Sequence, residues 1–342
     1  GVVPAAPRPR WRGLLHGQVG GLPGPFWWLF AGTVVNRAGT FIEPFFVLYL
    51  TGPRGVSTST TGVVLTVWGA GSLLSACGSD SSGDGSGSDI AVVQRFPNTG
   101  LVPGEIRLPV SLANQKGILD NAATKSYASL NGHVIDVASG KTVVDAVTAE
   151  KHGEGLALPY WPFVVTIEKA GTYALVIDGT SKDGAAFQLT DPKNVDIPTV
   201  GTALPPFDTP TVDDSRGVEQ ICTLPSGTCP FHTVTLTDAL KSGKPVVYLI
   251  GTPAHCQTGS CAPALQALVE VAKSTSDKAV YVHAEVYADK KATKLAPAIG
   301  AYNLQFEPVL FVTDSGGVLR HRLDGVFDVN EVRDTLAQMK IA

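Results

Sequence analysis

A short apolar run at residues 246–250 constrains the fold most strongly, because it leads directly into a turn that carries two cysteines. Its β-branched and aromatic residues predict a buried strand, and apolar residues at helical spacing predict a helix over 262–273. The turn between them holds His255, Cys256 and Cys261. A helix start offers unpaired N–H groups and a positive dipole end, which lower a thiol pKa. We therefore expect Cys256 and Cys261 to form a redox-active pair.

The spacing of this pair departs from the usual redox motif. Four residues separate Cys256 from Cys261, whereas two residues are usual. In a continuous helix, cysteines five positions apart would lie off a common face. A disulfide therefore requires Cys256 to lie in non-helical backbone, and Gly259 allows the bend.

The following residues predict a regular order of elements. We expect strands at 234–236, 246–250 and 278–286, a hairpin at 309–323 around the turn 314–317, and helices at 236–241, 262–273, 289–302 and 330–339. With Glu307-Pro308-Val309, this order resembles a thioredoxin-like domain of the extracytoplasmic type, over residues 229–342. The resemblance implies that Pro308 is cis, faces the cysteine turn and helps to bind an extended substrate backbone. The chain departs from the family in its cysteine spacing and in lacking a tryptophan before Cys256.

The resemblance implies thiol–disulfide exchange with protein thiols or disulfides as partners. Cys256 would be the attacking thiolate, Cys261 would resolve the mixed disulfide, and His255 would tune the thiolate. No cofactor or metal is assigned. One alternative is a redox-inactive binding scaffold with a permanent disulfide. Less favoured alternatives are a thiol peroxidase and a copper site formed by His255, Cys256, Cys261 and His283.

The other three cysteines have separate interpretations. Cys222 and Cys229 flank a short loop with Pro225 and Gly227, and we expect them to form a structural disulfide. Leu74-Ser75-Ala76-Cys77 is similar to a bacterial lipobox, which predicts lipidation of Cys77. Residues 78–89 contain only Gly, Ser and Asp and predict a flexible tether.

The first 76 residues predict a signal or membrane segment. An aromatic-rich apolar stretch at 26–50 is long enough to span a bilayer, although it contains Asn36, Arg37 and Glu43. Residues 27–46 resemble the first membrane helix of major facilitator superfamily transporters, and residues 60–74 resemble the start of the second. Such a transporter needs many more helices, so this segment is expected to serve at most as an export signal or anchor.

The middle of the chain predicts an all-β domain. Seven candidate strands at 91–96, 105–112, 127–136, 143–149, 163–168, 173–177 and 185–190 suggest an immunoglobulin-like sandwich. The expected layout is 1–76 membrane segment, 77–89 tether, 90–197 sandwich, 198–221 linker and 222–342 thioredoxin-like α/β domain. Lys and Arg are few and scattered and the net charge is −4, which argues against nucleic-acid binding. The sequence thus predicts a protein anchored at the extracytoplasmic face of the cell membrane.

Overall fold

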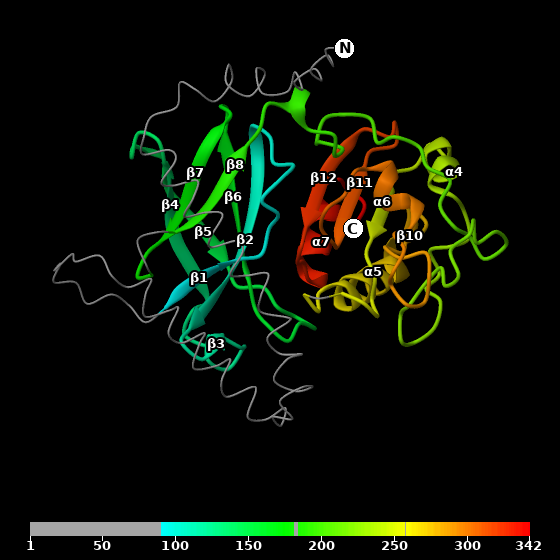
Figure 1. Ribbon diagram of the computed structural model, residues 1–342, viewed down its shortest axis with the longest axis horizontal. Coiled ribbons are helices and arrows are strands. Elements are labelled where there is room, and N and C mark those ends of the chain that lie inside the picture. Colours follow the sequence, from blue (N-terminus) through cyan, green and yellow to red (C-terminus); the bar gives the residue numbers. More distant parts are fainter. Residues whose placement is uncertain (1–89, 181–183, 257) are drawn as a thin grey trace, which may run out of the picture. The chain divides into compact units, whose positions relative to one another are not determined.

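The computed structural model describes residues 90–180, 184–256 and 258–342, which contain three four-stranded β-sheets (Figure 1). Two of the sheets are formed by residues 91–189, and the third by residues 246–324. We refer to residues 90–197 as the two-sheet region and to residues 198–342 as the C-terminal region.

The two-sheet region is antiparallel throughout. One sheet contains β1 (Ala91–Gln94), β2 (Gly104–Asn114), β3 (Gly117–Ile118) and β6 (Trp161–Ile167). The other has the order β5-β4-β7-β8, with β4 at Ser129–Asp136, β5 at Thr142–Glu150, β7 at Gly171–Ile177 and β8 at Ala185–Leu189. A 3-10 turn, η1 (Pro192–Asn194), follows. Each of the seven predicted strands overlaps an observed one, and β3 is additional.

Side-chain alternation explains why the two sheets share one core. In β6, Trp161, Phe163 and Val165 are buried, while Val164 between them is exposed. Successive residues of a strand point to opposite faces, so one face of β6 contributes to the core. The buried side chains of both sheets form a single apolar cluster that includes Trp161, Phe163 and Leu175.

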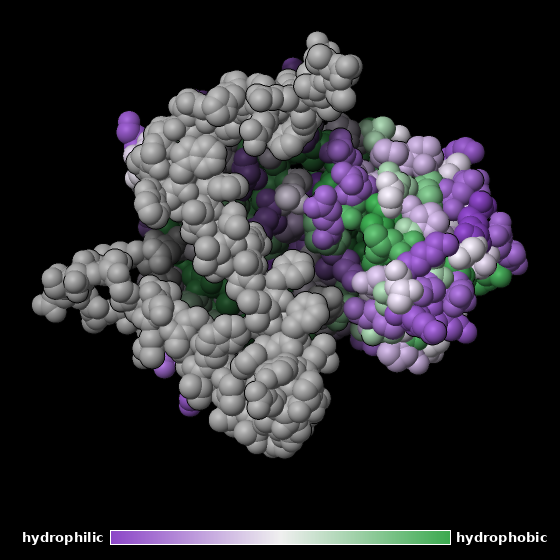
Figure 2. All heavy atoms as spheres, in the orientation of Figure 1, coloured by the Kyte–Doolittle hydropathy of each residue, from purple (hydrophilic) through white to green (hydrophobic). Residues whose placement is uncertain are grey.

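The C-terminal region contains a mixed sheet of order β10-β9-β11-β12. Its strands are β9 (Val246–Ile250), β10 (Val280–Ala284), β11 (Val309–Thr313) and β12 (Leu319–Asp324). Strand β10 pairs with β9 in parallel, and the other two pairings are antiparallel. All five residues of β9 are buried because it is a central strand with an apolar cluster on each face. The visible face of this region is mainly hydrophilic, with a smaller hydrophobic area (Figure 2).

Four helices accompany this sheet among the described residues. They are α4 (Leu236–Lys241), α5 (Cys261–Thr275), α6 (Pro297–Ala301) and α7 (Val329–Gln338). The Asp328 carboxylate accepts the backbone N–H of Glu331 and so caps the start of α7. The apolar side chains of α5 and α7 pack together in one cluster with Val247 and Leu249 of β9. The N-terminus of α5 is thereby held beside the end of β9.

The fold-class prediction is wrong. The described residues form mostly antiparallel sheets with few helices, and a thioredoxin-like α/β fold preceded by an immunoglobulin-like sandwich is not shown. At the predicted strand 234–236, the Thr235 hydroxyl accepts the Asp238 N–H and begins helix α4 instead. The predicted helix 289–302 is reduced to α6, because the Asp289 carboxylate accepts the N–H groups of Thr293 and Lys294 and holds a turn there.

The membrane prediction concerns residues that the structure does not describe. The segment 1–76, the lipidation site Cys77 and the tether 78–89 all lie outside the described residues. Within the described ranges, we find no helix with the length and apolar character needed to cross a membrane.

The expected linker, residues 198–221, packs against the C-terminal sheet. Its Gly201 and Leu204 N–H groups donate to carbonyls of Leu319 and Gly317, and the Leu319 N–H donates back to Thr202. The Leu204 side chain is buried in the same cluster as Tyr248 of β9. This segment is therefore an ordered extension beside β12.

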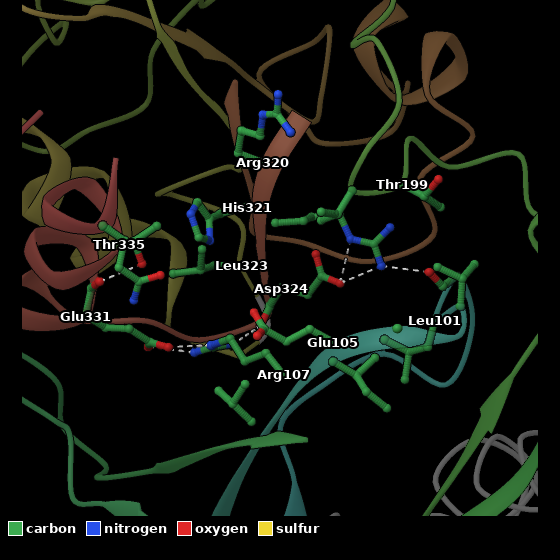
Figure 3. A pocket seen from close by; sticks show the side chains of 18 of the residues that line it. Leu101, Glu105, Arg107, Thr199, Arg320, His321, Leu323, Asp324, Glu331 and Thr335 are labelled. Carbon is green, nitrogen blue, oxygen red and sulfur yellow. Dashed lines mark hydrogen bonds and ion pairs between the residues drawn. The ribbon is translucent and has the colours of Figure 1, made fainter. Parts of the chain in front are cut away.

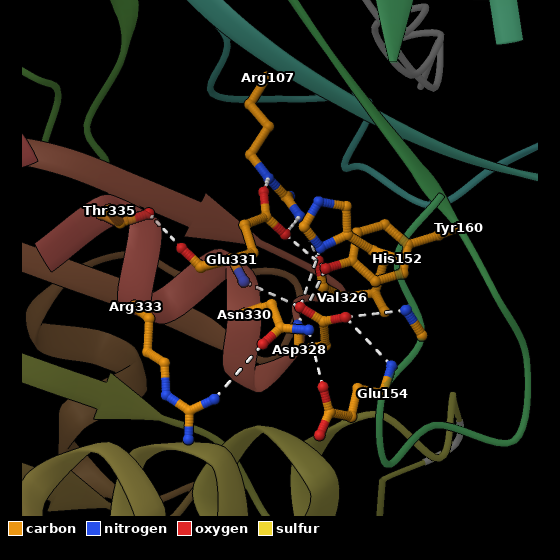
Figure 4. A network of polar contacts seen from close by, with 11 residues as sticks. Arg107, His152, Glu154, Tyr160, Val326, Asp328, Asn330, Glu331, Arg333 and Thr335 are labelled. Atoms are coloured by element: carbon orange, nitrogen blue, oxygen red, sulfur yellow. Dashed lines mark hydrogen bonds and ion pairs between the residues drawn. The ribbon is translucent and has the colours of Figure 1, made fainter. Parts of the chain in front are cut away.

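A polar network joins the two-sheet region to α7 (Figure 4). Arg107 of β2 forms a two-pronged ion pair with Glu331, with N–O distances of 2.5 and 2.7 Å. The hydroxyl of Tyr160 donates to Glu331 at 2.5 Å and accepts the Asp328 N–H at 2.9 Å. Trp161, the next residue, is fully buried in the core. Tyr160 therefore contacts the C-terminal region, whereas Trp161 packs in the core of the two-sheet region.

A cavity of about 550 Å³ lies next to this network (Figure 3). Arg107 and Arg322 both line it, but each already has a carboxylate partner, Glu331 and Asp324 respectively. Arg322 also donates to the carbonyls of Gly100 and Pro198. These two arginines are therefore already engaged in ion pairs within the protein.

Candidate functional site

Cys256 and Cys261 form a disulfide in the turn between β9 and α5. Their Cα atoms are 6.0 Å apart, within the usual range for a disulfide. Gly259 has a φ of +67°, in the left-handed region that a glycine enters at little cost. The bend expected at Gly259 is therefore present and allows the four-residue spacing to close.

The two sulfurs differ in exposure. Cys261 is the first residue of α5 and is 1% exposed, whereas Cys256 is only partly buried. The backbone N–H of Cys261 donates to Cys256 Sγ at 3.3 Å, and the Thr258 hydroxyl lies 3.2 Å from the same sulfur. These contacts and the positive end of the helix dipole are of the kind that favours negative charge on a cysteine sulfur. Cys256 is therefore the sulfur that a partner can reach.

Glu307 lies beside the buried sulfur of Cys261. Its carboxylate lies 3.5 Å from Cys261 Sγ and accepts the Thr252 N–H at 2.8 Å. Burial raises the pKa of Glu307 to about 7, and the charge of Glu285 adds to this effect. A carboxyl group with a pKa near neutrality can both give and take a proton at physiological pH.

Pro308 follows Glu307 and lies close to the cysteine turn. The Glu307–Pro308 peptide bond is cis, as predicted. A Cβ atom added to Gly251 would lie 3.2 Å from Pro308 Cβ and 3.6 Å from Cys261 Cβ. Gly251 therefore allows the end of β9 to approach both residues closely.

His255 has different neighbours from those expected. Its ring packs edge-on against Tyr287, with 5.8 Å between ring centroids. Among the described residues, no hydrogen bond joins His255 to either cysteine. The structure therefore gives no contact through which His255 would tune the thiolate.

The predicted disulfide between Cys222 and Cys229 is replaced by two free, buried thiols. They gather with His232 and His283, so that one donor atom of each of the four residues lies within 4.8 Å of the others. Cys229 Sγ is 3.7 Å from His283 Nδ1, and that nitrogen is 3.1 Å from His232 Nε2. His283 therefore does not join Cys256 and Cys261 in the copper site considered above.

The cluster has strongly shifted pKa values. The hydrogen bond between the two cysteines lowers the pKa of Cys222 and raises that of Cys229. Burial opposes charge on His283, but the hydrogen bond to Cys222 and the charge of Glu285 raise its pKa overall. The cluster can thus hold thiolate sulfur beside imidazole nitrogen, as redox chemistry or metal binding requires.

The two cysteine groups are linked through Thr223. Its backbone N–H and hydroxyl donate to Glu285 at 2.6 and 2.8 Å, and its hydroxyl accepts the N–H of Ala254 in the cysteine turn at 3.0 Å. His283 Nε2 also lies 3.0 Å from the Gly251 carbonyl. The loop that carries Cys222 therefore contacts the turn that carries Cys256.

Comparisons with known proteins identify no family for this chain. No protein-family model matches the sequence, and a search of curated proteins found no match. The class of site is consequently defined by the structure alone: a disulfide at a helix N-terminus beside a buried Cys/His cluster, compatible with redox chemistry or metal handling.

Three functional candidates were missed in the sequence: Glu307, Glu285 and His232. The motif Cys222-x6-Cys229-x2-His232 places three metal-type ligands within eleven residues, a signal that was available. In the sequence, the resemblance to a known family pointed to Pro308, and nothing indicated that the carboxylate of Glu307 lies beside Cys261. Its pKa depends on burial, which the sequence does not show.

Proposed function

We propose that this protein performs thiol–disulfide exchange with protein partners through Cys256 and Cys261. The observation that carries the proposal is the disulfide at the N-terminus of α5, with a partly exposed sulfur on Cys256 and a buried sulfur on Cys261. A partner can attack only a sulfur that it can reach, so the difference in exposure assigns the two roles.

The reaction begins when a substrate thiolate attacks Cys256 Sγ. A mixed disulfide forms, and the bond between Cys256 and Cys261 breaks, which leaves the electron pair on Cys261. Glu307 in its protonated form gives a proton to this sulfur. A second substrate thiolate then attacks the substrate sulfur of the mixed disulfide and releases Cys256 as a thiolate. Two electrons have passed from the substrate dithiol to the cysteine pair.

In the reverse direction the carboxylate of Glu307 accepts the Cys261 proton. The resulting thiolate attacks Cys256 in the mixed disulfide and releases the reduced substrate. Hydrogen bonding of Cys256 by the Cys261 N–H supports its role as the attacking and leaving sulfur in both directions. Pro308 is buried beside the turn and is proposed to align the partner backbone indirectly, by fixing the position of the turn.

The proposed location follows from residues outside the described part of the chain. The lipobox-like segment at Cys77 supports export and attachment to the outer face of the cell membrane. Protein disulfides form and persist mainly in oxidising compartments such as this one.

A pair of matched variants tests the proposal. Cys261→Ser keeps the accessible nucleophile. This variant should accumulate a mixed disulfide with a small aromatic disulfide or with a model protein in its oxidised, disulfide-bonded form. Cys256→Ser removes the nucleophile and should form none through Cys261, which is buried. Equal trapping by both variants would refute the assignment of roles.

Redox titration of the wild-type chain separates an exchange enzyme from the redox-inactive scaffold. Mass-spectrometric thiol mapping across a graded glutathione series should show Cys256–Cys261 opening reversibly between about −120 and −270 mV. A potential below about −300 mV would identify a permanent structural bond and contradict the proposal.

A further inference from the structure

We propose that Cys222, Cys229, His232 and His283 bind one zinc ion in a closed tetrahedral site. This cluster lies outside the Cys256–Cys261 disulfide and has no role in the exchange reaction proposed above. It uses two sulfur and two imidazole donors, a set that is typical of structural zinc.

The ring orientations of both histidines support a metal. His232 Nδ1 lies 3.3 Å from the Pro210 carbonyl, and His283 Nε2 lies 3.0 Å from the Gly251 carbonyl. A carbonyl oxygen only accepts hydrogen bonds, so these outer nitrogens carry the protons. Metal-bound histidines commonly donate their second ring N–H to a backbone carbonyl in this way.

The inner nitrogens then require a cation between them. With the outer positions protonated, neutral imidazoles leave lone pairs on His232 Nε2 and His283 Nδ1, which are 3.1 Å apart. Two lone pairs this close repel each other unless a proton or a metal ion lies between them. The adjacent sulfurs of Cys222 and Cys229 favour a metal, because they complete a four-donor set around the same space.

The spacing agrees with tetrahedral zinc. Zinc–nitrogen bonds of about 2.0–2.1 Å and zinc–sulfur bonds of about 2.3 Å place two nitrogens about 3.3 Å apart and a sulfur and a nitrogen about 3.6 Å apart. The observed distances are 3.1 Å between the nitrogens and 3.7 Å between Cys229 Sγ and His283 Nδ1. The donors therefore need to move by only a few tenths of an ångström at these two pairs.

Burial defines the type of site. The four residues are between 0% and 5% exposed, so all four donors lie away from solvent. Two thiolates and a divalent ion have no net charge together, which reduces the cost of burying them. Four protein donors fill a tetrahedral ion and leave no position for substrate, as in structural zinc sites.

The position of the ion explains what it would stabilise. Cys222, Cys229 and His232 lie on one loop, and His283 lies on β10. Zinc would therefore fasten this loop to the sheet beside Gly251 and Thr223, which contact the cysteine turn. A site of this kind holds the turn in place without taking part in exchange.

The first test is metal analysis of the full-length wild-type chain, purified anaerobically without chelator. Native and elemental mass spectrometry should find one zinc per chain. Replacement with Co²⁺ should give the intense visible bands of a tetrahedral ion and thiolate-to-metal charge transfer. A metal-free protein that binds no added Zn²⁺, a Cys222–Cys229 disulfide in that protein, or selective binding of Cu⁺ over Zn²⁺ would overturn the proposal.

Variants locate the ion. His283→Gln and Cys222→Ser should lose the stoichiometric zinc, whereas Cys256→Ser and His255→Gln should retain it. The first two variants can fail to fold. The cobalt spectrum of the wild-type chain does not depend on them and reports directly on tetrahedral coordination by thiolates. If zinc disappears in Cys256→Ser but persists in His283→Gln, the ion belongs to the exchange pair and the assignment is wrong.

Discussion

Replacing Glu307 with glutamine should change how the stability of the oxidised protein depends on pH. Glu307 is held between Thr252 after β9, Cys261 at the start of α5 and the neighbouring carboxylate Glu285 after β10. Burial and the Glu285 charge raise the pKa of Glu307 from 4.5 to about 7. Folding therefore favours the protonated form of this side chain.

The sign follows from proton binding. Between pH 4.5 and about 7 the folded protein holds a proton on Glu307 that the unfolded chain has released. The stabilisation is complete below pH 4.5 and is lost as the pH rises through about 7. A shift of this size corresponds to at most about 3.4 kcal/mol. Because the side chain is partly exposed, solvent screening reduces the expected effect to about 1–2 kcal/mol.

The assay is equilibrium unfolding by denaturant at several pH values between 4.5 and 8.5. Relative to Glu307→Gln, wild type should lose about 1–2 kcal/mol of unfolding free energy between the two ends of this range. The exposed Glu150→Gln is the matched control and should show no such change. A difference between wild type and Glu307→Gln that is constant with pH would refute the argument.

Two further comparisons test contacts that hold the described residues together. Arg107→Met leaves Glu331 buried without its arginine partner and should lower the unfolding free energy by about 3 kcal/mol. The control is Arg320→Met, which breaks the ion pair with Asp314. Because the Arg320 side chain is 52% exposed, this change should cost under about 1 kcal/mol. Equal losses in thermal or denaturant unfolding would contradict the importance of the buried pair. Gly251→Ala should cost about 1–3 kcal/mol and slow thiol exchange, because its Cβ would crowd the cysteine turn. The control is Gly300→Ala in α6, where an added Cβ would meet open space. This change should be neutral or stabilising by up to about 1 kcal/mol. If Gly251→Ala matches Gly300→Ala in stability and exchange rate, the turn tolerates the extra atom.

Local elements were predictable because their signals lie close together in the sequence. The strand 246–250 was predicted with its observed ends, since an unbroken apolar run suits a strand buried on both faces. The helix 236–241 also has its predicted ends. In the two-sheet region, alternation of apolar and polar residues indicated seven strands.

The fold class was not predictable in the same way. The predicted helix 289–302 was wrong because side-chain capping by Asp289 competes with helical hydrogen bonds, and its outcome depends on local geometry. The expected linker proved to be packed because Leu204 finds an apolar partner in the C-terminal core. Neither the capping by Asp289 nor the packing of Leu204 produces a periodic pattern in the sequence.

The sequence by itself determined where the two sulfurs of the disulfide lie along the chain and that Cys256 and Cys261 can pair. The tertiary structure alone decided their unequal exposure, the pKa of Glu307 and the gathering of Cys222, Cys229 and His232 around His283. The physical reason is distance along the chain: His283 is more than fifty residues from both cysteines and from His232. Spacing rules describe neighbours within a turn or a helix, whereas burial and long-range clustering arise only when the sheet and helices pack.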